Sequence, residues 1–151
     1  MKNHFKLLAI GVLIFIVYFS PFKVVIVSGN SMYPTLKNKQ ILLAMKTDKF
    51  NRNDLVVALI EDNYIIKRIK YVAGDEIFYF LTYDSELPIL VSKEFYDNYS
   101  YNSKSEMVQK FTIENKRVYL IGDNLNLSDD SRRFGSVDVN FIKYKIIFPR
   151  F

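Results

Sequence analysis

From residue 23 onwards the chain consists of short runs rich in Val, Ile, Tyr and Phe, and this pattern restricts the fold more than any other feature. Clusters of Asn, Asp, Gly and Lys separate the runs, as is typical of strands joined by turns. No amphipathic pattern of helical length dominates, so the pattern predicts a compact, mainly β domain. The seven expected strands are Lys23–Val27, Gln40–Met45, Leu55–Ile60, Tyr64–Val72, Glu76–Leu81, Arg117–Ile121 and Phe141–Phe148.

Length and composition indicate one ordered domain. The chain has 151 residues, of which 50% are hydrophobic and 16% aromatic, enough for a single substantial core. Residues 84–116 stand apart, because the stretch 84–105 is rich in Tyr, Ser, Asn and Lys. We expect a variable excursion there, with one short helix, within a domain that covers residues 23–151.

The N-terminal segment has the character of a membrane anchor. No charged residue interrupts Leu7–Phe19, and the span from Phe5 to Phe22, which includes Lys6, is 18 residues long. A helix that crosses a bilayer needs about 17–25 residues. The competing interpretation is a cleaved signal peptide, whose apolar region runs for about 7–15 residues. No A-x-A-like cleavage site follows the run, so we expect a transmembrane anchor over residues 7–22.

The flanking charges predict the orientation of this anchor. Lys2 and Lys6 precede the apolar run, and the positive-inside rule then keeps a tail of residues 1–6 in the cytoplasm. Lys23, on the far side, is a weaker and opposing signal. The expected protein is a single-pass protein of the cell membrane with its β domain outside the cytoplasm.

The inventory of side chains excludes several kinds of site. The chain has no cysteine, which excludes disulfides and thiolate metal sites, and its single histidine is His4. No acidic cluster suggests an oxygen-only metal site, so we expect no metal and no cofactor. The net charge of +5 and the pI near 9.3 fit an anionic membrane or an ordinary basic surface. No nucleic-acid-binding motif accompanies the charge, so nucleic acid is not an expected partner.

The segment Ser28–Leu36, with the sequence SGNSMYPTL, contains a candidate nucleophile. Gly29-Asn30 is a turn signal that lifts Ser31 out of a strand and leaves nearby N–H groups free to bind an oxyanion. Pro34 prevents a helix, so Ser31 should lie on a fixed loop. The alternative is an ordinary surface turn with a hydrogen-bonded serine. Because the domain has no histidine or cysteine, a lysine is the remaining plausible base for this serine.

Lys67 is the candidate base. It lies in the apolar run Tyr64–Ile69, where strand alternation places Ile65, Lys67 and Ile69 on one face. If that face is buried, desolvation favours the neutral amine and lowers its pKa from about 10.4. A neutral amine can accept the proton of a serine. The alternative is that Lys67 points to solvent, as half of a basic pair with Arg68.

A polar loop follows the expected strand Arg117–Ile121. It begins with the tight turn Gly122-Asp123-Asn124. The hydroxyl of Ser128 could orient a neutral lysine amine, and Asp130 and Arg132 can pair and pin the loop. Taken alone, this segment is only a polar loop.

Together, the blocks S-M-x-P-T-L, K-R-x(5)-G-D and G-D-N-x(3)-S-x-D-S-R-x-F-G-x-V resemble type I signal peptidases. The blocks occur in the same order as in that family, and they follow an apolar segment similar to the family's membrane anchor. Its compact length and the tyrosine at position 33, Tyr33, make the chain more similar to the enzymes of Gram-positive bacteria than to those of Gram-negative bacteria. The family consists of membrane-anchored Ser-Lys endopeptidases, and the resemblance implies a mainly β domain of coiled antiparallel sheets.

The resemblance also implies roles for individual residues. Ser31 would be the nucleophile, with its N–H in the oxyanion hole, and Lys67 would be the general base. Ser128 would position the lysine, and Asp130 with Arg132 would form the ion pair that shapes the loop.

The implied substrates are exported preproteins whose signal peptides carry small residues before the cut. They would bind extended beside a strand edge, with main-chain hydrogen bonds supplying affinity. Two small apolar pockets would receive alternate side chains, and motif position makes Val27, Met32, Leu36 and Ile65 their candidate walls. Membrane lipid and the secretion translocon are further candidate partners.

Four positions depart from the family pattern. Gly29 stands where Gram-negative relatives often carry an oxyanion-hole serine, and Ser28 lies one residue too early for that role. Ala73 replaces the usual proline before the Gly-Asp pair, and Leu125 replaces the common arginine after Gly-Asp-Asn. None of these changes removes a catalytic group, although the loop geometry could differ.

The sequence therefore predicts an active signal peptidase, with three alternatives. A specialised relative would mature one pilin or conjugation precursor, and the excursion at residues 84–116 would be its mark. An inactive homologue would act as an assembly factor for surface polymers, but the presence of both Ser31 and Lys67 argues against it. A self-cleaving repressor uses a similar Ser-Lys pair, but the membrane run and the lack of a DNA-binding domain disfavour it.

Overall fold

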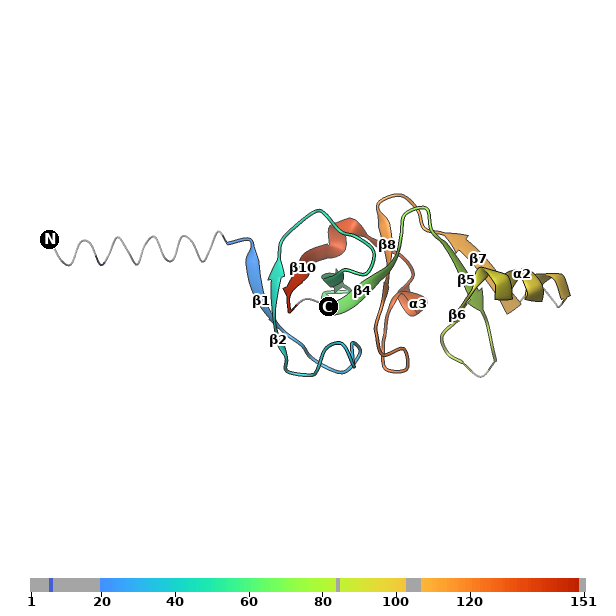
Figure 1. Cartoon of the computed structure of the whole chain (residues 1–151), viewed down its shortest axis with the longest axis horizontal. Coiled ribbons are helices and arrows are strands. Elements are labelled where there is room, and N and C mark those ends of the chain that lie inside the picture. Colours follow the sequence, from blue (N-terminus) through green and yellow to red (C-terminus); the bar gives the residue numbers. More distant parts are fainter. Residues whose placement is uncertain (1–5, 7–19, 84, 103–106, 150–151) are drawn as a thin grey trace.

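The computed structural model describes residues 6, 20–83, 85–102 and 107–149, which fold mainly as antiparallel strands (Figure 1). The larger of two sheets has seven strands. In spatial order they are β1 (Phe22–Ile26), β2 (Ile41–Met45), β10 (Ile142–Phe148), β3 (Leu55–Ile60), β4 (Asn63–Val72), β8 (Arg117–Ile121) and β9 (Val137–Asp138). A short helix, α3 (Ser131–Phe134), and a 3-10 turn, η2 (Val139–Phe141), flank β9 in the chain.

The smaller sheet lies at the end of the molecule away from β1 (Figure 1). Its strands are β6 (Ile89–Val91), β5 (Glu76–Phe80) and β7 (Val108–Thr112), in that order, and helix α2 (Lys93–Asn102) packs beside it. Aromatic side chains form this contact, with Phe80 of β5 edge-on to Phe95 and Tyr99 of α2. The excursion at residues 84–116 thus contains the expected helix.

All seven expected strands are present, each with ends within one residue of the prediction. The prediction missed β6, β7, β9 and α3. Three of these are very short, and β7, with the sequence VQKFT, lies in a polar segment that carries little local strand signal. It becomes a strand because it pairs along the whole of β5.

The core is built around β3, which lies in the middle of the larger sheet and has a hydrophobic cluster on each face. Residues 55–58 are all buried, and alternate ones enter different clusters. One cluster comprises Val27, Met32, Leu36, Leu42, Ala44, Leu55, Val57 and Ile146. The other comprises Val56, Ala58, Ile69, Val118, Leu120, Val137 and Ile142.

Tyr119 joins the two sheets. It is fully buried on β8 and packs with Ile77 of β5, and its hydroxyl is hydrogen-bonded to that of Tyr79. Its neighbour Ile121 belongs to the same small cluster and leads into the Gly122 turn. The junction therefore holds the base of the polar loop in place.

The expected cytoplasmic tail (residues 1–6) and anchor (residues 7–22) lie mostly outside the described residues. The end of the anchor prediction is wrong, because Phe22 begins β1 and pairs with Met45 rather than ending a helix. In the part of the chain that the structure describes, no helix is long and apolar enough to cross a bilayer.

Candidate active site

Ser31 begins a turn, over residues 31–35, that follows β1. Gly29 allows the chain to leave the strand, because its φ of 88° lies in the region that favours glycine. The N–H of Gly29 donates to Oδ1 of Asn38 at 3.1 Å. The N–H of Asn124 donates to the carbonyl oxygen of Ser31 at 2.9 Å. Ser31 is thus held on a fixed loop, as predicted, with its carbonyl bound to the Gly-Asp-Asn turn.

Lys67 is buried on β4 with only 4% of its surface exposed, which confirms that it faces inward. Burial lowers the pKa of its amine, and the nearby carboxylates of Asp130 and Asp129 partly oppose this effect. No ion pair to Lys67 occurs among the described residues. The amine therefore sits in surroundings that favour its neutral form.

Ser31 and Lys67 line the same cavity, which has a volume of about 180 Å³. One wall comes from the end of β1 and the chain after it, and the facing wall comes from the first half of β4. The complete lining is Val25, Ile26, Val27, Ser28, Ser31, Met32, Val57, Tyr64, Ile65, Ile66 and Lys67. The structure thus brings together a serine and a desolvated lysine from distant parts of the chain.

Three of the four predicted wall residues line this cavity, namely Val27, Met32 and Ile65. The prediction for Leu36 is wrong. Leu36 is fully buried in the core cluster with Leu42 and does not line the cavity. Its N–H donates to the carbonyl oxygen of Met32 at 2.9 Å, so one turn of chain places Met32 at the cavity and Leu36 beneath it.

Gly122 brings Ser128 against the Ser31 loop. A β-carbon at Gly122 would lie 2.1 Å from Oγ of Ser128 and 2.6 Å from the carbonyl oxygen of Ser31, so only glycine fits between them. The Ser128 hydroxyl is buried and has no hydrogen-bond partner within the described residues. It is close enough to Asp130 to help lower that residue's pKa, yet no hydrogen bond of normal geometry joins the two.

Asp130 and Arg132 form the predicted ion pair, with Nε of Arg132 2.9 Å from Oδ1 of Asp130. The carboxylate is fully buried and also accepts a hydrogen bond from the N–H of Gly122 at 3.1 Å. Burial raises the pKa of Asp130, but the hydrogen bond from Arg132 and the others it accepts lower the pKa below its ordinary value. Arg132 also donates to the carbonyl oxygens of Leu125 at 2.7 Å and Ser128 at 3.3 Å. Together these bonds hold the whole loop.

A second ion pair was not predicted. Nη2 of Arg68, the neighbour of Lys67, lies 2.7 Å from Oδ2 of Asp123, and the guanidinium also donates to the carbonyl oxygen of Asn53 at 2.9 Å. Two parallel charge-assisted bonds join the guanidinium of Arg68 to the carboxylate of Asp123, and such a pair fixes orientation as well as distance. Oppositely charged residues are common in sequence, so only the pairing of β4 with β8, which sets Arg68 opposite Ile121, identifies the partners.

Ser28 and Tyr64 are also at the cavity but were not assigned to its walls. Ser28 lines it beside Val27, and Tyr64 lies across from it, with 66% of its surface exposed. The strand pattern around Lys67 could have indicated Tyr64, which starts the same apolar run. No group of three or more His, Cys, Asp or Glu in the described residues could hold a metal ion. The cavity holds a hydroxyl and a buried amine whose pKa is lowered by desolvation.

The chain is similar to several known proteins. A family model described as "Signal peptidase, peptidase S26" matches residues 1–150. "Mitochondrial inner membrane protease subunit 1" of Homo sapiens is 30% identical over 132 residues, covering 83% of this chain and 67% of the relative. The protein of the same name from Xenopus tropicalis is also 30% identical over 132 residues. That alignment covers 82% of this chain and 66% of the relative. "Signal peptidase I" of Bacillus caldolyticus is 28% identical over 143 residues, covering 82% of this chain and 76% of the relative.

One solved structure is also similar. It is a signal peptidase I from Enterococcus faecalis V583, with 21% sequence identity and a TM-score of 0.39. The alignment covers 66% of this chain and 97% of that chain.

Proposed function

The chain belongs to the signal peptidase family, peptidase S26, and we propose that it is an active type I signal peptidase that removes signal peptides from exported preproteins. The observation that carries the proposal is the shared cavity of Ser31 and the buried Lys67. An inactive assembly factor would have no use for a desolvated amine beside a serine.

In the proposed reaction, Oγ of Ser31 attacks the carbonyl carbon of the scissile peptide while the neutral amine of Lys67 takes the hydroxyl proton. The N–H of Ser31 contributes to the stabilisation of the oxyanion. The C–N bond then breaks, and the protonated Lys67 returns the proton to the departing amine of the mature protein. Lys67 then takes a proton from the water that attacks the ester, and it returns this proton to Oγ of Ser31 as the C–O bond breaks and the signal peptide leaves.

Ser128 is assigned to position the amine of Lys67. Its buried hydroxyl has no partner among the described residues and lies against Gly122, beside the Ser31 loop. Asp130 and Arg132 act indirectly, because their ion pair and its hydrogen bonds hold the loop that carries Ser128. None of these three groups needs to change protonation state during the reaction.

Two free strand edges support binding of an extended substrate. β1 is an edge strand of the larger sheet. Residues 63–67 of β4 pair only with β3, because the pairing of β4 with β8 begins at Arg68. Both segments border the cavity, so a signal peptide laid between them can form main-chain hydrogen bonds with either. The small cavity volume favours small side chains before the cut.

An exposed apolar face supports a position on the membrane. Val24 is 63% exposed and pairs with Leu43, while Ile26 is 64% exposed and pairs with Ile41, so these side chains share one face of the sheet. Phe148 of β10, opposite Leu43, extends the patch. This face, together with the expected anchor, would hold the cavity near the lipid in which a signal peptide is embedded.

Cleavage of a panel of preproteins tests the proposal. We expect the wild type to cut several of them after small residues, while Ser31→Ala and Lys67→Ala lose activity. The double variant should be no worse than either single one, because the two groups act as a unit. Lys67→Arg should also fail, since a guanidinium stays protonated. Near-wild-type cleavage by Lys67→Arg would remove lysine from the mechanism.

The same panel separates the alternatives. Cleavage of a single precursor would indicate the specialised peptidase. Substitutions in the excursion around α2 would then test whether that segment selects the precursor. Cleavage of none, by a folded protein, would favour the assembly factor.

A further inference from the structure

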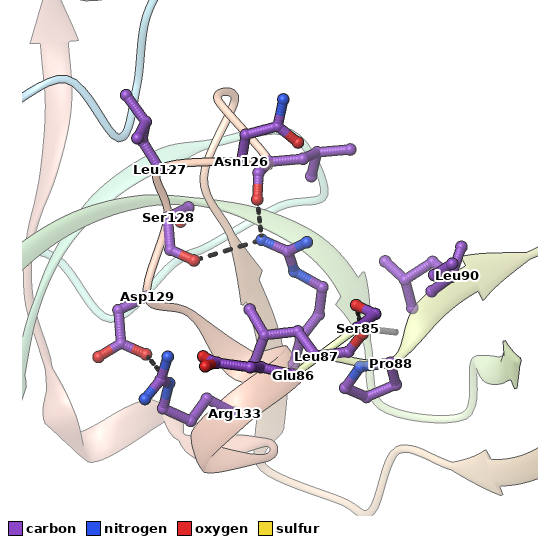
Figure 2. A pocket seen from close by; sticks show the side chains of 13 residues that line it. Ser85, Glu86, Leu87, Pro88, Leu90, Asn126, Leu127, Ser128, Asp129 and Arg133 are labelled. Carbon is purple, nitrogen blue, oxygen red and sulfur yellow. Dashed lines mark hydrogen bonds and ion pairs between the residues drawn. The ribbon is translucent and has the colours of Figure 1, made fainter. Parts of the chain in front are cut away.

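A larger cavity lies elsewhere in the described part of the chain than the one lined by Ser31 and Lys67. It has a volume of about 740 Å³, within the range of about 300–1,000 Å³ typical of ligand-binding clefts. Figure 2 shows its two walls. Glu86, Leu87, Pro88 and Leu90 come from β6 and the chain before it, and Leu127, Ser128 and Asp129 come from the loop after β8.

This cavity adjoins the proposed catalytic groups. Ser128 is part of its lining, and Ser128 touches Gly122, which in turn touches the carbonyl of Ser31. The cavity of Ser31 and Lys67 shares no lining residue with it. Two separate hollows therefore adjoin the proposed catalytic groups, one lined by Ser31 and Lys67 and the other by Ser128.

A peptidase that cuts inside a chain must hold polypeptide on both sides of the scissile bond. The hollow between β1 and β4 can receive the signal-peptide side, as argued above. We propose that the larger cavity receives the first residues on the other side, those that become the N-terminus of the mature protein. This inference rests on the proposed function and adds a second determinant of specificity to it.

The lining predicts what those residues prefer. Leu87 is half-buried in one wall, and Leu125, in the facing loop, exposes 52% of its surface. Arg132 donates hydrogen bonds to the carbonyl oxygens of Leu125 and Ser128, so this wall is held in place before any substrate arrives. Of the charged residues in the lining, Arg133 pairs with Asp129 at 2.9 Å. Seven of the thirteen lining residues are polar or charged, so the leucines on the two walls are what favours an apolar side chain soon after the cut.

Two preproteins that differ only in the first two residues after the cut test this preference. One carries leucines there and the other serines. We expect the kcat/KM of the full-length wild type to favour the leucine substrate by on the order of tenfold. Leu87→Ser and Leu125→Ser should each reduce this ratio toward one. Tyr101→Ser, which changes an exposed side chain outside the cavity, should leave it unchanged.

An equal rate on both substrates in the wild type, or an unchanged ratio in both leucine variants, would overturn the proposal. A second measurement does not depend on catalysis. Non-cleaving Ser31→Ala protein is incubated with preproteins that carry a photo-crosslinking side chain either two residues before or two residues after the cut. The later probe should label residues 85–90 or 125–133, and the earlier one should label residues 25–28 or 64–66.

Labelling by the later probe at other places, or none at all, would contradict the cavity assignment. If the wild type cleaves neither preprotein but the later probe labels these walls, the catalytic proposal fails while the cleft stands. If cleavage is normal and the label lies elsewhere, the cleft assignment fails while the catalytic proposal stands.

Discussion

Arg68 binds Asp123 through two parallel hydrogen bonds, from Nε to Oδ1 at 2.8 Å and from Nη2 to Oδ2 at 2.7 Å. Burial raises the pKa of Asp123, but the hydrogen bonds from Arg68 and Thr35 lower it below its ordinary value, so the carboxylate stays charged. The pair ties the strand of Lys67 to the turn whose Asn124 holds Ser31. The proposed nucleophile and base are thus connected through a rigid ion pair that contacts neither of their reacting atoms.

Replacing Asp123 should therefore harm catalysis as well as folding. We expect Asp123→Asn to lower the free energy of unfolding by about 1–3 kcal/mol and to reduce kcat more than it raises KM, because Ser31 and Lys67 lose their mutual orientation. Denaturant unfolding and steady-state kinetics measure the two effects. Arg52→Gln is the matched control, since its pair with Asp75 is exposed and should contribute less than about 1 kcal/mol. Equal effects of the two variants on kcat would refute the positioning role.

Gly122 should tolerate no side chain. In Gly122→Ala, the new methyl group would meet both Ser128 and the backbone of Ser31, and we expect overpacking to cost about 1–3 kcal/mol of stability. Activity should fall to near background, because the two groups it pushes apart belong to the proposed site. Adding Ser128→Gly removes one clash but leaves the Ser31 carbonyl at 2.6 Å, so the double variant should not regain stability fully. Wild-type stability and activity in Gly122→Ala would show that Ser128 and the backbone of Ser31 leave room for a β-carbon at residue 122.

Activity should rise with pH as Lys67 loses its proton. Burial lowers the pKa of this amine, so the midpoint of the rise should lie below the ordinary value of 10.5. The carboxylate of Asp129 opposes this shift, and Asp129→Asn should therefore move the midpoint to slightly lower pH. Asp48→Asn, a change to an exposed carboxylate that is not among the groups acting on Lys67, is the control. A midpoint that both variants leave unchanged would mean that another group controls the rise.

The same lysine should make stability depend on pH. Its pKa is lower in the folded than in the unfolded chain, so the unfolded chain binds more protons between the two values. Stability should therefore increase with pH across that window and decrease as pH falls through the folded pKa. Lys67→Met keeps the buried volume without the charge, and denaturant titrations at several pH values should show this dependence removed. The variant should be inactive yet at least as stable as the wild type at neutral pH.

Asp130 should give a dependence of the same sign, but at acidic pH. Its pKa is lowered in the folded chain, so its contribution is present above the unfolded value and is lost as pH falls through the folded one. We expect Asp130→Asn to lose about 3–5 kcal/mol at neutral pH, because Arg132 is left as an unpaired, nearly buried charge. The variant should also lose less stability than the wild type on acidification. Asp138→Asn, outside the loop, provides the comparison.

The exposed apolar face should bind lipid. A chain truncated before Ser20 should sediment with phospholipid vesicles, and Val24→Asp or Ile41→Asp should weaken that binding by roughly threefold to tenfold. Tyr101→Asp, at an even more exposed position on α2, should leave binding unchanged. All three variants should cleave a short soluble peptide at the same rate. Unaltered vesicle binding by both sheet variants would exclude this face as the lipid contact.

Local sequence patterns were enough to predict seven strands and the inward position of Lys67. Hydrophobic periodicity is a local property, and it located seven strands because each has enough Val, Ile, Tyr and Phe to show it. The same alternation placed Lys67 on the inward face of β4, and the order of three short motifs indicated the family before any contact was known. The ion pair of Asp130 and Arg132 was also accessible, since the two residues are neighbours in one turn.

Tertiary structure alone decided which distant groups meet. Whether Met32 or Leu36 reaches the cavity depends on how one turn of chain sits on the core, and sequence spacing does not contain that information. The approach of Ser128 to Ser31 requires the strands between them to close into a sheet, which places Gly122 at the contact. β7 and the larger cavity likewise exist only because separate segments pair or face each other across the fold. Local patterns specify elements, whereas the contacts between elements depend on the packing of the whole domain.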